Sequence, residues 1–497
     1  MNALLLATAL LSAAPEPELR WGADAQGGAP YVFQDPTDPN HLIGFEVELA
    51  GALGEKLGLR ARPIQGPWDK LLELLARGDF DVALNGIEVA EEKKRVVLLS
   101  RPYFSAPERL TIRAGDATAP RTLEALKGRK VGTLPGSMAE RILTRAGADV
   151  RTYEGGQDEI YADLKLARTD AVLLDGPIAL FYGELDSDFE NVPGEFGNVE
   201  YAIALRLDDE ARRARVNAAL EALTRDGTLR ALYERWGLWS PQVARLLGDA
   251  DPIARHPPEE LLRWRAAVGK LPPFWERVKT RYPQVLPLFL EGALLSVAVS
   301  LLAMMLAILL GVALAMGRRY GPRLVSLACV AYIEFFRGTP LLIQLTMVYF
   351  GLPELGLKLS PFVAGVVALG LNYAAAEAEN YRAGLESVPA GQLEAATVLG
   401  LSRAQSLRFI VAPQAVRIAI PPMTNDFIAL LKDSSLISLV TLTELTKTYT
   451  TLASSMRDHL GLGLLVAFVY LLIGLPFAQL ARAVERRSGR HLKRGTA

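Results

Sequence analysis

The chain contains very little cysteine and histidine. Among 497 residues there is one cysteine, Cys329, and there are four histidines without regular spacing. A single cysteine excludes an intrachain disulfide and a cysteine-based metal site, and scattered histidines supply no ligand set. We therefore expect no disulfide framework, no bound metal and no other cofactor.

Two nucleotide- and ion-binding motifs are also absent. The sequence has no Gly-x-x-x-x-Gly-Lys-Ser/Thr string, so it has no P-loop to hold ATP. It has no Thr-Val-Gly-Tyr-Gly selectivity filter, which argues against a ligand-gated channel. The net charge of −1 is uninformative about partners because it averages two unlike halves. No nucleic-acid partner is expected. Any ATP-driven step is expected to come from a separate polypeptide.

Charge is distributed very unevenly along the chain. Charged residues occur throughout 16–285, whereas 292–317 has none. A helix over 292–317 would be about 39 Å long, enough to cross a bilayer with tilt. Further spans are expected at 324–352, 361–383, about 420–446 and 461–481, which gives about five. We therefore predict a water-soluble part followed by a membrane part over 286–485.

Basic residues predict the orientation. Arginines follow the first span, recur after the third and fill the tail 486–497, and loops rich in arginine and lysine stay in the cytoplasm. The amino-terminal part is then outside. Residues 1–14 form a short apolar run that ends in small residues, as in a secretory signal peptide, and are too few to span. No basic residue precedes this run, so an uncleaved anchor or a misassigned start is the alternative.

Residues 15–240 alternate short apolar strands with helices. Helices are expected at 45–57, 69–77 and 137–146, and strands at 80–84, 129–132 and 170–174, which is α/β organisation. The pattern restarts after Ala114, so we predict two lobes, joined near Leu110–Arg113 and near Tyr201–Leu205. A hinged cleft between two lobes is a preferred ligand site.

Five strings in this part are distinctive: IGFEVELAGALGEKLG, PWDKLLELLARGDFDVALNGI, EEKKRVVLLSRPYF, LKGRKVGTLPGS and DAVLLDGPIAL. Together they resemble the periplasmic amino-acid-binding proteins of ABC importers over nearly all of 19–240. The resemblance implies a periplasmic-binding-protein (type II) fold that closes on one polar solute, with an amino acid expected.

The resemblance also implies a set of binding residues. Ser137 lies in the loop whose backbone amides meet the solute carboxylate, and Asp175 matches the acid that receives the ammonium. The full set is Tyr31, Asn85, Gly86, Glu88, Lys93, Ser137 and Asp175. The alternative interpretation is that the glycine serves a turn, Ser137 caps a helix and Asp175 is a surface carboxylate.

Three positions depart from that family's pattern. Lys93 stands where an arginine usually grips the α-carboxylate, and a lysine lacks the planar two-pronged group. Glu88 stands where a small hydroxyl residue is usual, and a stacking aromatic is replaced within Gln26-Gly27-Gly28. A carboxylate beside a lysine either forms a self-cancelling ion pair or adapts the cleft to a cationic or non-amino-acid solute.

Residues 241–285 are rich in proline and are predicted to be a linker, with one short amphipathic helix over 259–268 that packs on a neighbour. In the membrane part, FFRGTPLLIQL places a proline and a glycine within the second span, which predicts a broken helix. This string, a later YFGLP and KDSSL resemble the permeases of polar-amino-acid ABC importers. Ionisable and polar residues end the third span and lie in the fourth: Glu377, Glu379, Arg382, Asn425, Asp426, Lys432 and Asp433. They mark either a pathway or span ends in water.

The loop 387–415 contains Glu394-Ala395-Ala396, then Gly400, then Ile410-Val411-Ala412-Pro413. Locally it predicts a helix over 391–399 stopped by Gly400 and a second helix opened by the capping box Ser402-x-x-Gln405. The string resembles the EAA loop of ABC importer permeases, which implies that Glu394, Ala395, Ala396 and Gly400 couple to a cytoplasmic ATP-binding subunit.

These expectations combine into one architecture. An α/β two-lobed binding domain precedes an all-α multi-span membrane domain (type I ABC importer permease). The membrane domain is expected to contact membrane lipid and to dimerise, and the closed binding domain is expected to dock on it from outside. The whole is a transporter subunit rather than an enzyme. The alternatives are a ligand-gated channel or sensor, an exported enzyme built on the two-lobed fold, and an importer of a solute other than an amino acid.

Overall fold

The computed structural model describes residues 17–153, 156–269 and 271–492. The predicted signal peptide, 1–14, lies outside these residues, as does the end of the basic tail. The chain forms two compact units. The first consists of residues 1–285 and 450–459, and the second of residues 286–449 and 460–497. Each unit is described by itself.

The first lobe is built on a five-stranded sheet in the order β4-β1-β5-β13-β6. Its strands are β1 (Glu18–Ala23), β4 (Arg60–Gln65), β5 (Val82–Ala83), β6 (Leu98–Leu99) and β13 (Ala204–Leu205). β1 runs parallel to β4 and β5, and β13 is antiparallel to its neighbours. The helices α2 (Phe45–Leu57), α3 (Leu71–Arg77) and α7 (Glu210–Arg225) belong to this lobe. The predicted helices at 45–57 and 69–77 are confirmed, although the second begins as a 3₁₀ turn at Trp68–Lys70.

The second lobe is built on a sheet in the order β11-β7-β10-β8-β9, with β12 also paired to β7. Its strands are β7 (Phe104–Arg113), β8 (Lys130–Thr133), β9 (Asp149–Thr152), β10 (Ala171–Asp175), β11 (Phe189–Asn191) and β12 (Asn198–Tyr201). The helices α4 (Met138–Ala146) and α5 (Gln157–Lys165) pack on it. Two sheets with their own helices confirm the two-lobed α/β prediction.

The chain crosses between the lobes twice. It passes from β6 to β7 through residues 100–103, and from β12 to β13 through Ala202 and Ile203. The second crossing was predicted correctly. The predicted crossing at Leu110–Arg113 is wrong, because Leu110 and Ile112 lie inside β7 and are buried in the core of the second lobe.

The proline-rich segment contains helices that pack on the receptor. α8 (Thr228–Arg235) precedes it, and α9 (Pro241–Leu247), α10 (Glu259–Val268) and α11 (Phe274–Thr280) lie within it. The predicted helix 259–268 is confirmed residue for residue. Trp264 of α10 is 3% exposed, and its ring centroid is 4.9 Å from that of Phe181. At least α10 therefore extends the core of the first unit.

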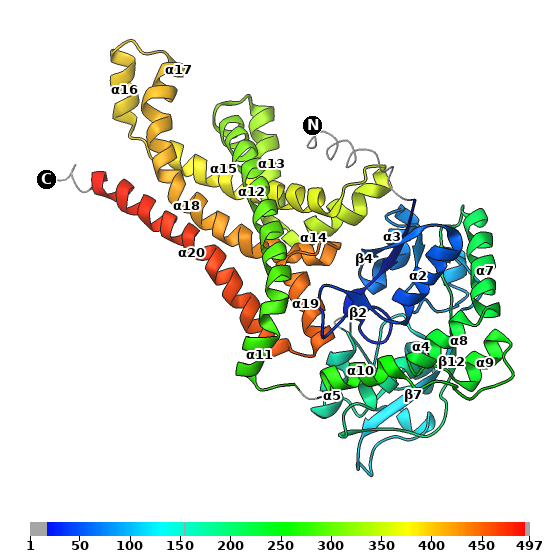
Figure 1. The fold of residues 1–497 in the computed structure, drawn as a ribbon. Coiled ribbons are helices and arrows are strands. Elements are labelled where there is room, and N and C mark those ends of the chain that lie inside the picture. Colours follow the sequence, from blue (N-terminus) through cyan, green and yellow to red (C-terminus); the bar gives the residue numbers. More distant parts are fainter. Residues whose placement is uncertain (1–16, 154–155, 270, 493–497) are drawn as a thin grey trace, which may run out of the picture. The chain divides into compact units, whose positions relative to one another are not determined.

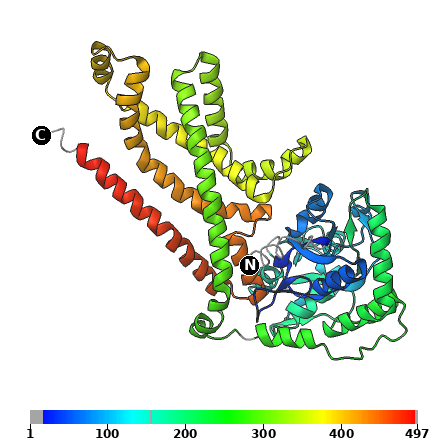
Figure 2. The same ribbon diagram turned by 45° about the horizontal axis from the view of Figure 1, so that its top comes forward.

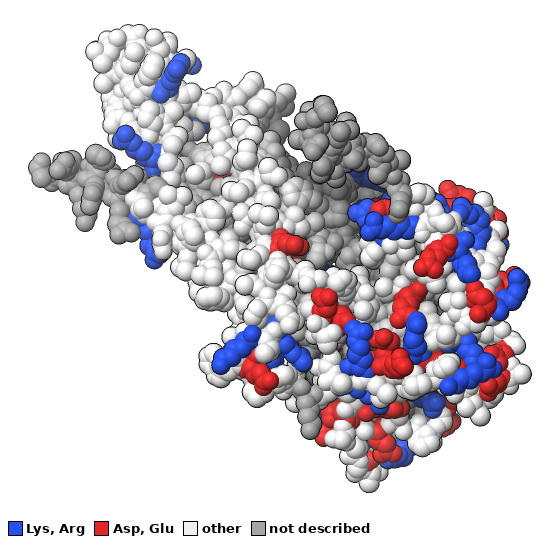
Figure 3. All heavy atoms as spheres, in the orientation of Figure 1, with Lys and Arg blue, Asp and Glu red and all other residues white. Residues whose placement is uncertain are grey.

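The second unit is helical. Its elements are α12 (Tyr282–Tyr320), α13 (Arg323–Gly338), α14 (Leu341–Thr346), α15 (Pro361–Glu386), α16 (Ala390–Val398), α17 (Arg403–Ser406), α18 (Ala412–Asp433), α19 (Leu445–Met456) and α20 (His459–Leu492). The first residues of α12 and α20 and the second half of α19 belong to the first unit. Among the described residues, α12, α15 and α20 are long and apolar enough to cross a membrane, and α13 with 341–355 forms a fourth candidate bent by 106°. Few charged side chains appear on the visible described surface of this unit (Figure 3).

The predicted bounds of the fourth span, about 420–446, are wrong. α18 starts earlier, continues through Pro421 and Pro422, and ends at Asp433, after which 434–440 forms a 3₁₀ turn. Two views show that the end of α12, the α16–α17 hairpin and the carboxyl end of α20 lie at the same end of the unit (Figures 1 and 2). Arg318 and Arg319 lie at the end of α12, Arg403 lies on α17 and Arg482 on α20, so these arginines are on elements that share one end of the unit, as the orientation requires.

Candidate functional site

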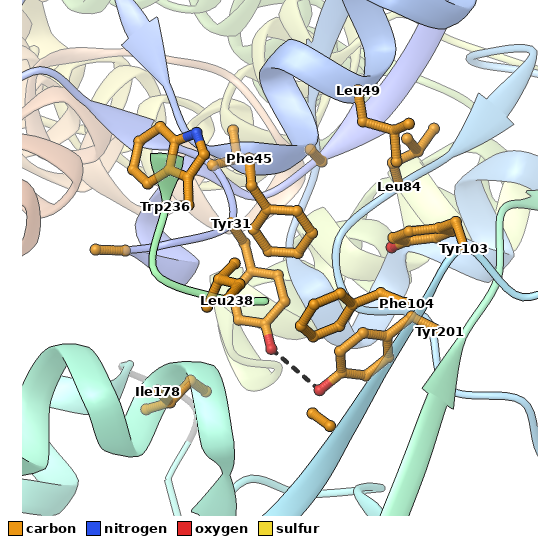
Figure 4. Packing of buried hydrophobic residues seen from close by; sticks show 14 of the residues in the cluster. Tyr31, Phe45, Leu49, Leu84, Tyr103, Phe104, Ile178, Tyr201, Trp236 and Leu238 are labelled. Atoms are coloured by element: carbon orange, nitrogen blue, oxygen red, sulfur yellow. Dashed lines mark hydrogen bonds between the residues drawn. The ribbon is translucent and has the colours of Figure 1, made fainter. Parts of the chain in front are cut away.

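Tyr31 and Asp175 meet across the two lobes. The Tyr31 hydroxyl donates to Asp175 Oδ2 at 2.8 Å, and the Tyr201 hydroxyl donates to the same oxygen at 2.6 Å. The two tyrosine hydroxyls are 3.0 Å apart (Figure 4). Asp175 also caps a short helix, since Ile178 N donates to Oδ1 at 3.0 Å. Burial raises the pKa of Asp175, and its hydrogen-bond donors oppose that rise.

Asn85 and Gly86 hold the end of β5 beside Tyr31. Asn85 Oδ1 accepts from Asp24 N at 2.7 Å, and Trp68 Nε1 donates to the Asn85 carbonyl at 2.8 Å. Gly86 has a φ of +61°, and a Cβ there would lie 3.3 Å from the Tyr31 ring. Only glycine adopts this conformation readily while leaving room for the aromatic ring.

Glu88 also bridges the lobes. Its Oε1 accepts from Met138 N at 2.8 Å, at the first turn of α4, and its Oε2 accepts from Arg141 at 2.8 Å. Lys93 Nζ is 3.8 Å from Glu88 and 5.7 Å from the centroid of Trp68. Burial lowers the pKa of Lys93, and Glu88 opposes this shift. Glu88, 5% exposed, thus has three cationic or N–H partners from both lobes.

Ser137 is the N-cap of α4. Its hydroxyl oxygen accepts from Glu140 N at 3.2 Å and donates to the Leu134 carbonyl at 2.7 Å. This geometry fits the alternative interpretation of Ser137 as a cap, and the backbone donor next to it, Met138 N, is the one that Glu88 contacts.

The structure therefore brings the seven expected residues to the inter-lobe region in two groups. One group is formed by Tyr31 and Asp175 with Asn85 and Gly86, and the other by Glu88 and Lys93 with Ser137.

The sequence analysis missed two charged residues there, Arg141 and Glu108. Arg141 follows Ser137 by four residues, so helical spacing could have indicated it. Glu108 faces Asp175 across the β7–β10 pairing and could not be found without the register.

The stacking aromatic that Gln26-Gly27-Gly28 lacks has a partial counterpart from the other lobe. The Tyr182 hydroxyl accepts from Ala29 N at 3.2 Å, and it lies where a Cβ on Gly28 would be. Gly28, with a φ of +78°, therefore makes room for a tyrosine of the second lobe.

The 387–415 loop has the predicted local structure. α16 is followed by Gly400 at a φ of +78°, and the Ser402–Gln405 capping box is present with both of its hydrogen bonds. Ala396 is buried at 1% exposure, whereas Val398 and Leu399 are 87% and 79% exposed. Val398 and Leu399 therefore expose apolar side chains next to the turn between α16 and α17.

The broken second span is stabilised by Gln344. Its Nε2 donates to Thr339 Oγ1 at 2.7 Å and to the Phe336 carbonyl at 3.0 Å, and its Oε1 accepts from Asn372 at 3.0 Å. These bonds satisfy carbonyls that the helix leaves open before Pro340, as backbone at membrane depth requires. The predicted break is confirmed.

Several ionisable residues of the later helices are paired within the second unit, whereas both carboxylate oxygens of Glu377 are buried without a hydrogen-bond partner among the described residues. Glu379 contacts Arg318 and accepts from Arg382 at 2.7 Å. Asn380 donates to Asp426, and Tyr373 to Asp433, both at 2.7 Å. The contacts of Arg318, Asn380 and Tyr373 link α15 to α12 and α18. They account for Glu379, Asp426 and Asp433 as helix-packing residues.

The fold and the inter-lobe region define a class of protein, a solute receptor of two α/β lobes fused to membrane-spanning helices. The chain belongs to two transport families: residues 19–238 match the bacterial extracellular solute-binding proteins, family 3, and residues 307–490 match the binding-protein-dependent transport system inner membrane component. It is therefore a fused binding protein and permease of an ABC importer, multi-pass in the inner membrane, with the binding domain on the outer side.

Individual relatives cover each part. The chain is 36% identical over 210 residues, 42% of its length, to the L-cystine-binding protein TcyJ of Escherichia coli K12, of which it covers 78%. It is 36% identical over 200 residues, 40% of its length, to the probable glutamine ABC transporter permease protein GlnM of Bacillus subtilis 168, of which it covers 93%. A solved ancestral arginine-binding protein bound to arginine matches 45% of this chain and 99% of its own at 32% identity, with a TM-score of 0.41.

Proposed function

We propose that this subunit imports polar amino acids, with a solute other than an amino acid as the alternative, works as a homodimer, and is driven by a separate ATP-binding subunit. The observation that carries the proposal is the presence of both families on one chain. The names of the relatives, for cystine and glutamine, support a solute of the amino-acid class.

The proposed division of labour follows the chain. Residues 15–240 bind the solute, 241–285 connect, and 286–485 form the permease, with α18 as the fourth of five crossings. At about 1.5 Å per residue, the 22 residues of α18 extend about 33 Å, enough to span hydrocarbon.

The inter-lobe residues Tyr31, Asn85, Gly86, Glu88, Lys93, Ser137 and Asp175 are proposed to bind the solute. Closure of the lobes around it is then the signal that the permease recognises. Because receptor and permease are covalently joined, the receptor's effective concentration at its permease is set by the chain rather than by diffusion.

The α16–α17 hairpin is proposed to dock into the ATP-binding subunit. Glu394, Ala395, Ala396 and Gly400 define its shape, and exposed Val398 and Leu399 offer apolar contact area. ATP binding by the partner would move this hairpin and with it α15 and α18, which pack on each other.

Uptake by proteoliposomes that contain the full chain and an ATP-binding partner tests the proposal. We expect uptake that requires ATP, and we expect Gly400→Asp and Glu394→Lys to abolish it without changing solute affinity. Gly391→Ala is the control, because Gly391 precedes Glu394 on α16 and has open space around its Cβ position. Normal uptake by both coupling variants, or solute-gated current without ATP, would refute the assignment.

A further inference from the structure

The anion-binding groups of the inter-lobe region already hold a carboxylate of the protein. Glu88 accepts from Met138 N, at the amino end of the nine-residue helix α4, where backbone N–H groups and the helix dipole favour an anion. The same carboxylate accepts from Arg141 at 2.8 Å and lies 3.8 Å from Lys93. A solute carboxylate would compete with Glu88 for all three groups.

The other two carboxylates of the inter-lobe region, Asp175 and Glu108, form no ion pair with a cationic side chain among the described residues. Asp175 accepts only from the neutral groups Tyr31, Tyr201 and Ile178 N. Glu108 is 1% exposed, and its buried Oε2 accepts no hydrogen bond. Glu108 and Asp175 face each other across adjacent strands, so their side chains project from the same face of the sheet.

The nearby cations form no ion pair with Glu108 or Asp175 among the described residues. Arg141 is engaged by Glu88 and by Glu92, the latter at 3.0 Å, and Lys93 lies against Glu88. Burial raises the pKa of Glu108, Asp175 and Glu88 raise it further, and Arg141 only partly opposes this rise. A buried, unpaired carboxyl is costly, and a cation placed beside it would stabilise the charged form.

We propose that Glu88 occupies the place of a solute carboxylate and that the receptor binds an organic amine cation without a free carboxylate, held by Asp175 and Glu108. This inference rests on the proposed function, because it assigns the solute class of the same inter-lobe site. With any bound solute, Glu88 keeps its contacts with Met138 N, Arg141 and Lys93 and so holds the lobes together. The positive charge of the amine neutralises Asp175 and Glu108.

Two matched pairs of solutes test the inference, since the members of each differ only by a carboxylate: agmatine against arginine, and cadaverine against lysine. Affinities are measured by calorimetry on the full chain in detergent micelles. We expect the wild-type protein to bind the amine at least tenfold more tightly than the amino acid in one pair or both. Equal or tighter binding of the amino acids in both pairs, or no binding of either amine, would overturn the inference.

Variants of Glu88 and Glu108 test their two proposed roles separately: Glu88 in the place of a solute carboxylate, and Glu108 in binding the amine. Glu88→Ser frees Met138 N, Arg141 and Lys93, so we expect arginine or lysine affinity to rise at least tenfold. Glu108→Gln should lower amine affinity at least tenfold without that gain. Glu92→Gln is the matched control, because Glu92 also pairs with Arg141 but leaves Glu88 in place, and we expect the wild-type preference.

Solute preference tests the inference, whereas ATP-dependent uptake tests the proposed function. If the wild-type protein prefers the amino acids and still takes them up with ATP, the importer stands and the inference falls. If the amines bind with the expected preference but no ATP-dependent uptake of them occurs, the inference stands and the proposed function falls.

Discussion

Glu46 of α2 provides a sharp test of the receptor's internal electrostatics. Its Oε1 accepts from Gly86 N at 2.8 Å and contacts the Tyr103 hydroxyl, while its Oε2 is buried without a partner. Burial raises the pKa of Glu46 from 4.5 to about 7, and the two hydrogen bonds oppose that rise. Glu46 therefore helps to fix the strand end that carries Asn85 and Gly86, at an electrostatic cost near neutral pH.

The sign of the pH dependence follows from proton counting. Between pH 4.5 and about 7 the native carboxyl keeps its proton and the unfolded one loses it, so unfolding releases a proton. The free energy of unfolding consequently falls as pH rises through this window. At ~1.36 kcal/mol per pKa unit, the full loss above pH 7 is roughly 3 kcal/mol.

Glu46→Gln removes the titration and keeps the size of the side chain and an acceptor for Gly86 N. We expect the variant to equal or fall below the wild-type protein in stability at pH 5 and to gain on it by about 2–3 kcal/mol by pH 8. Thermal unfolding of the receptor, followed by tryptophan fluorescence of the full chain from pH 5 to 8, measures this difference. Glu55→Gln, an exposed position on the same helix, is the control. Parallel pH profiles for wild type and Glu46→Gln would refute the reasoning.

Two further pairs of variants test the coupling hairpin and the linker. Gly400→Ala should reduce ATP-driven uptake severalfold, because a φ of +78° costs alanine about 1 kcal/mol. Gly391→Ala, at a helical position with open space around the Cβ, should leave uptake unchanged. Equal uptake by both variants would contradict the role of this turn. Trp264→Ala should destabilise the receptor by about 3–5 kcal/mol in denaturant unfolding, because the ring is buried against Phe181. Trp275→Ala removes a side chain that is 72% exposed and should have little effect; similar losses from both would show that α10 is not part of the receptor core.

Local sequence signals were sufficient for many helices. The helix 259–268, the Gly400 stop and the Ser402–Gln405 capping box all appear where the pattern places them. These features depend on residues within a few positions of one another, so propensity and capping rules describe them well. The break in the second span was predictable for the same reason, since a proline removes a backbone donor locally.

Features that depend on long-range pairing were not predictable. The apolar residues of 110–113 read as a crossing, but the register of β7 places them in the second lobe. The fourth span was expected at about 420–446, whereas α18 starts at Ala412, continues through Pro421 and Pro422, and ends at Asp433.

In the inter-lobe site, too, contacts between residues far apart in the sequence were not predictable. A family resemblance located Glu88 and Asp175, but it could not show that Arg141 and Met138 N engage Glu88, because these groups come from the other lobe. Glu108 was missed because only strand pairing brings it opposite Asp175.

The central claim, that one chain supplies both the receptor and the permease, is tested most directly by ATP hydrolysis. Proteoliposomes containing only the full chain and its ATP-binding partner should hydrolyse ATP faster when solute is added on the receptor side. No soluble binding protein should be needed, and Glu394→Lys should abolish the stimulation. Stimulation that appears only after a separate binding protein is added would contradict the account.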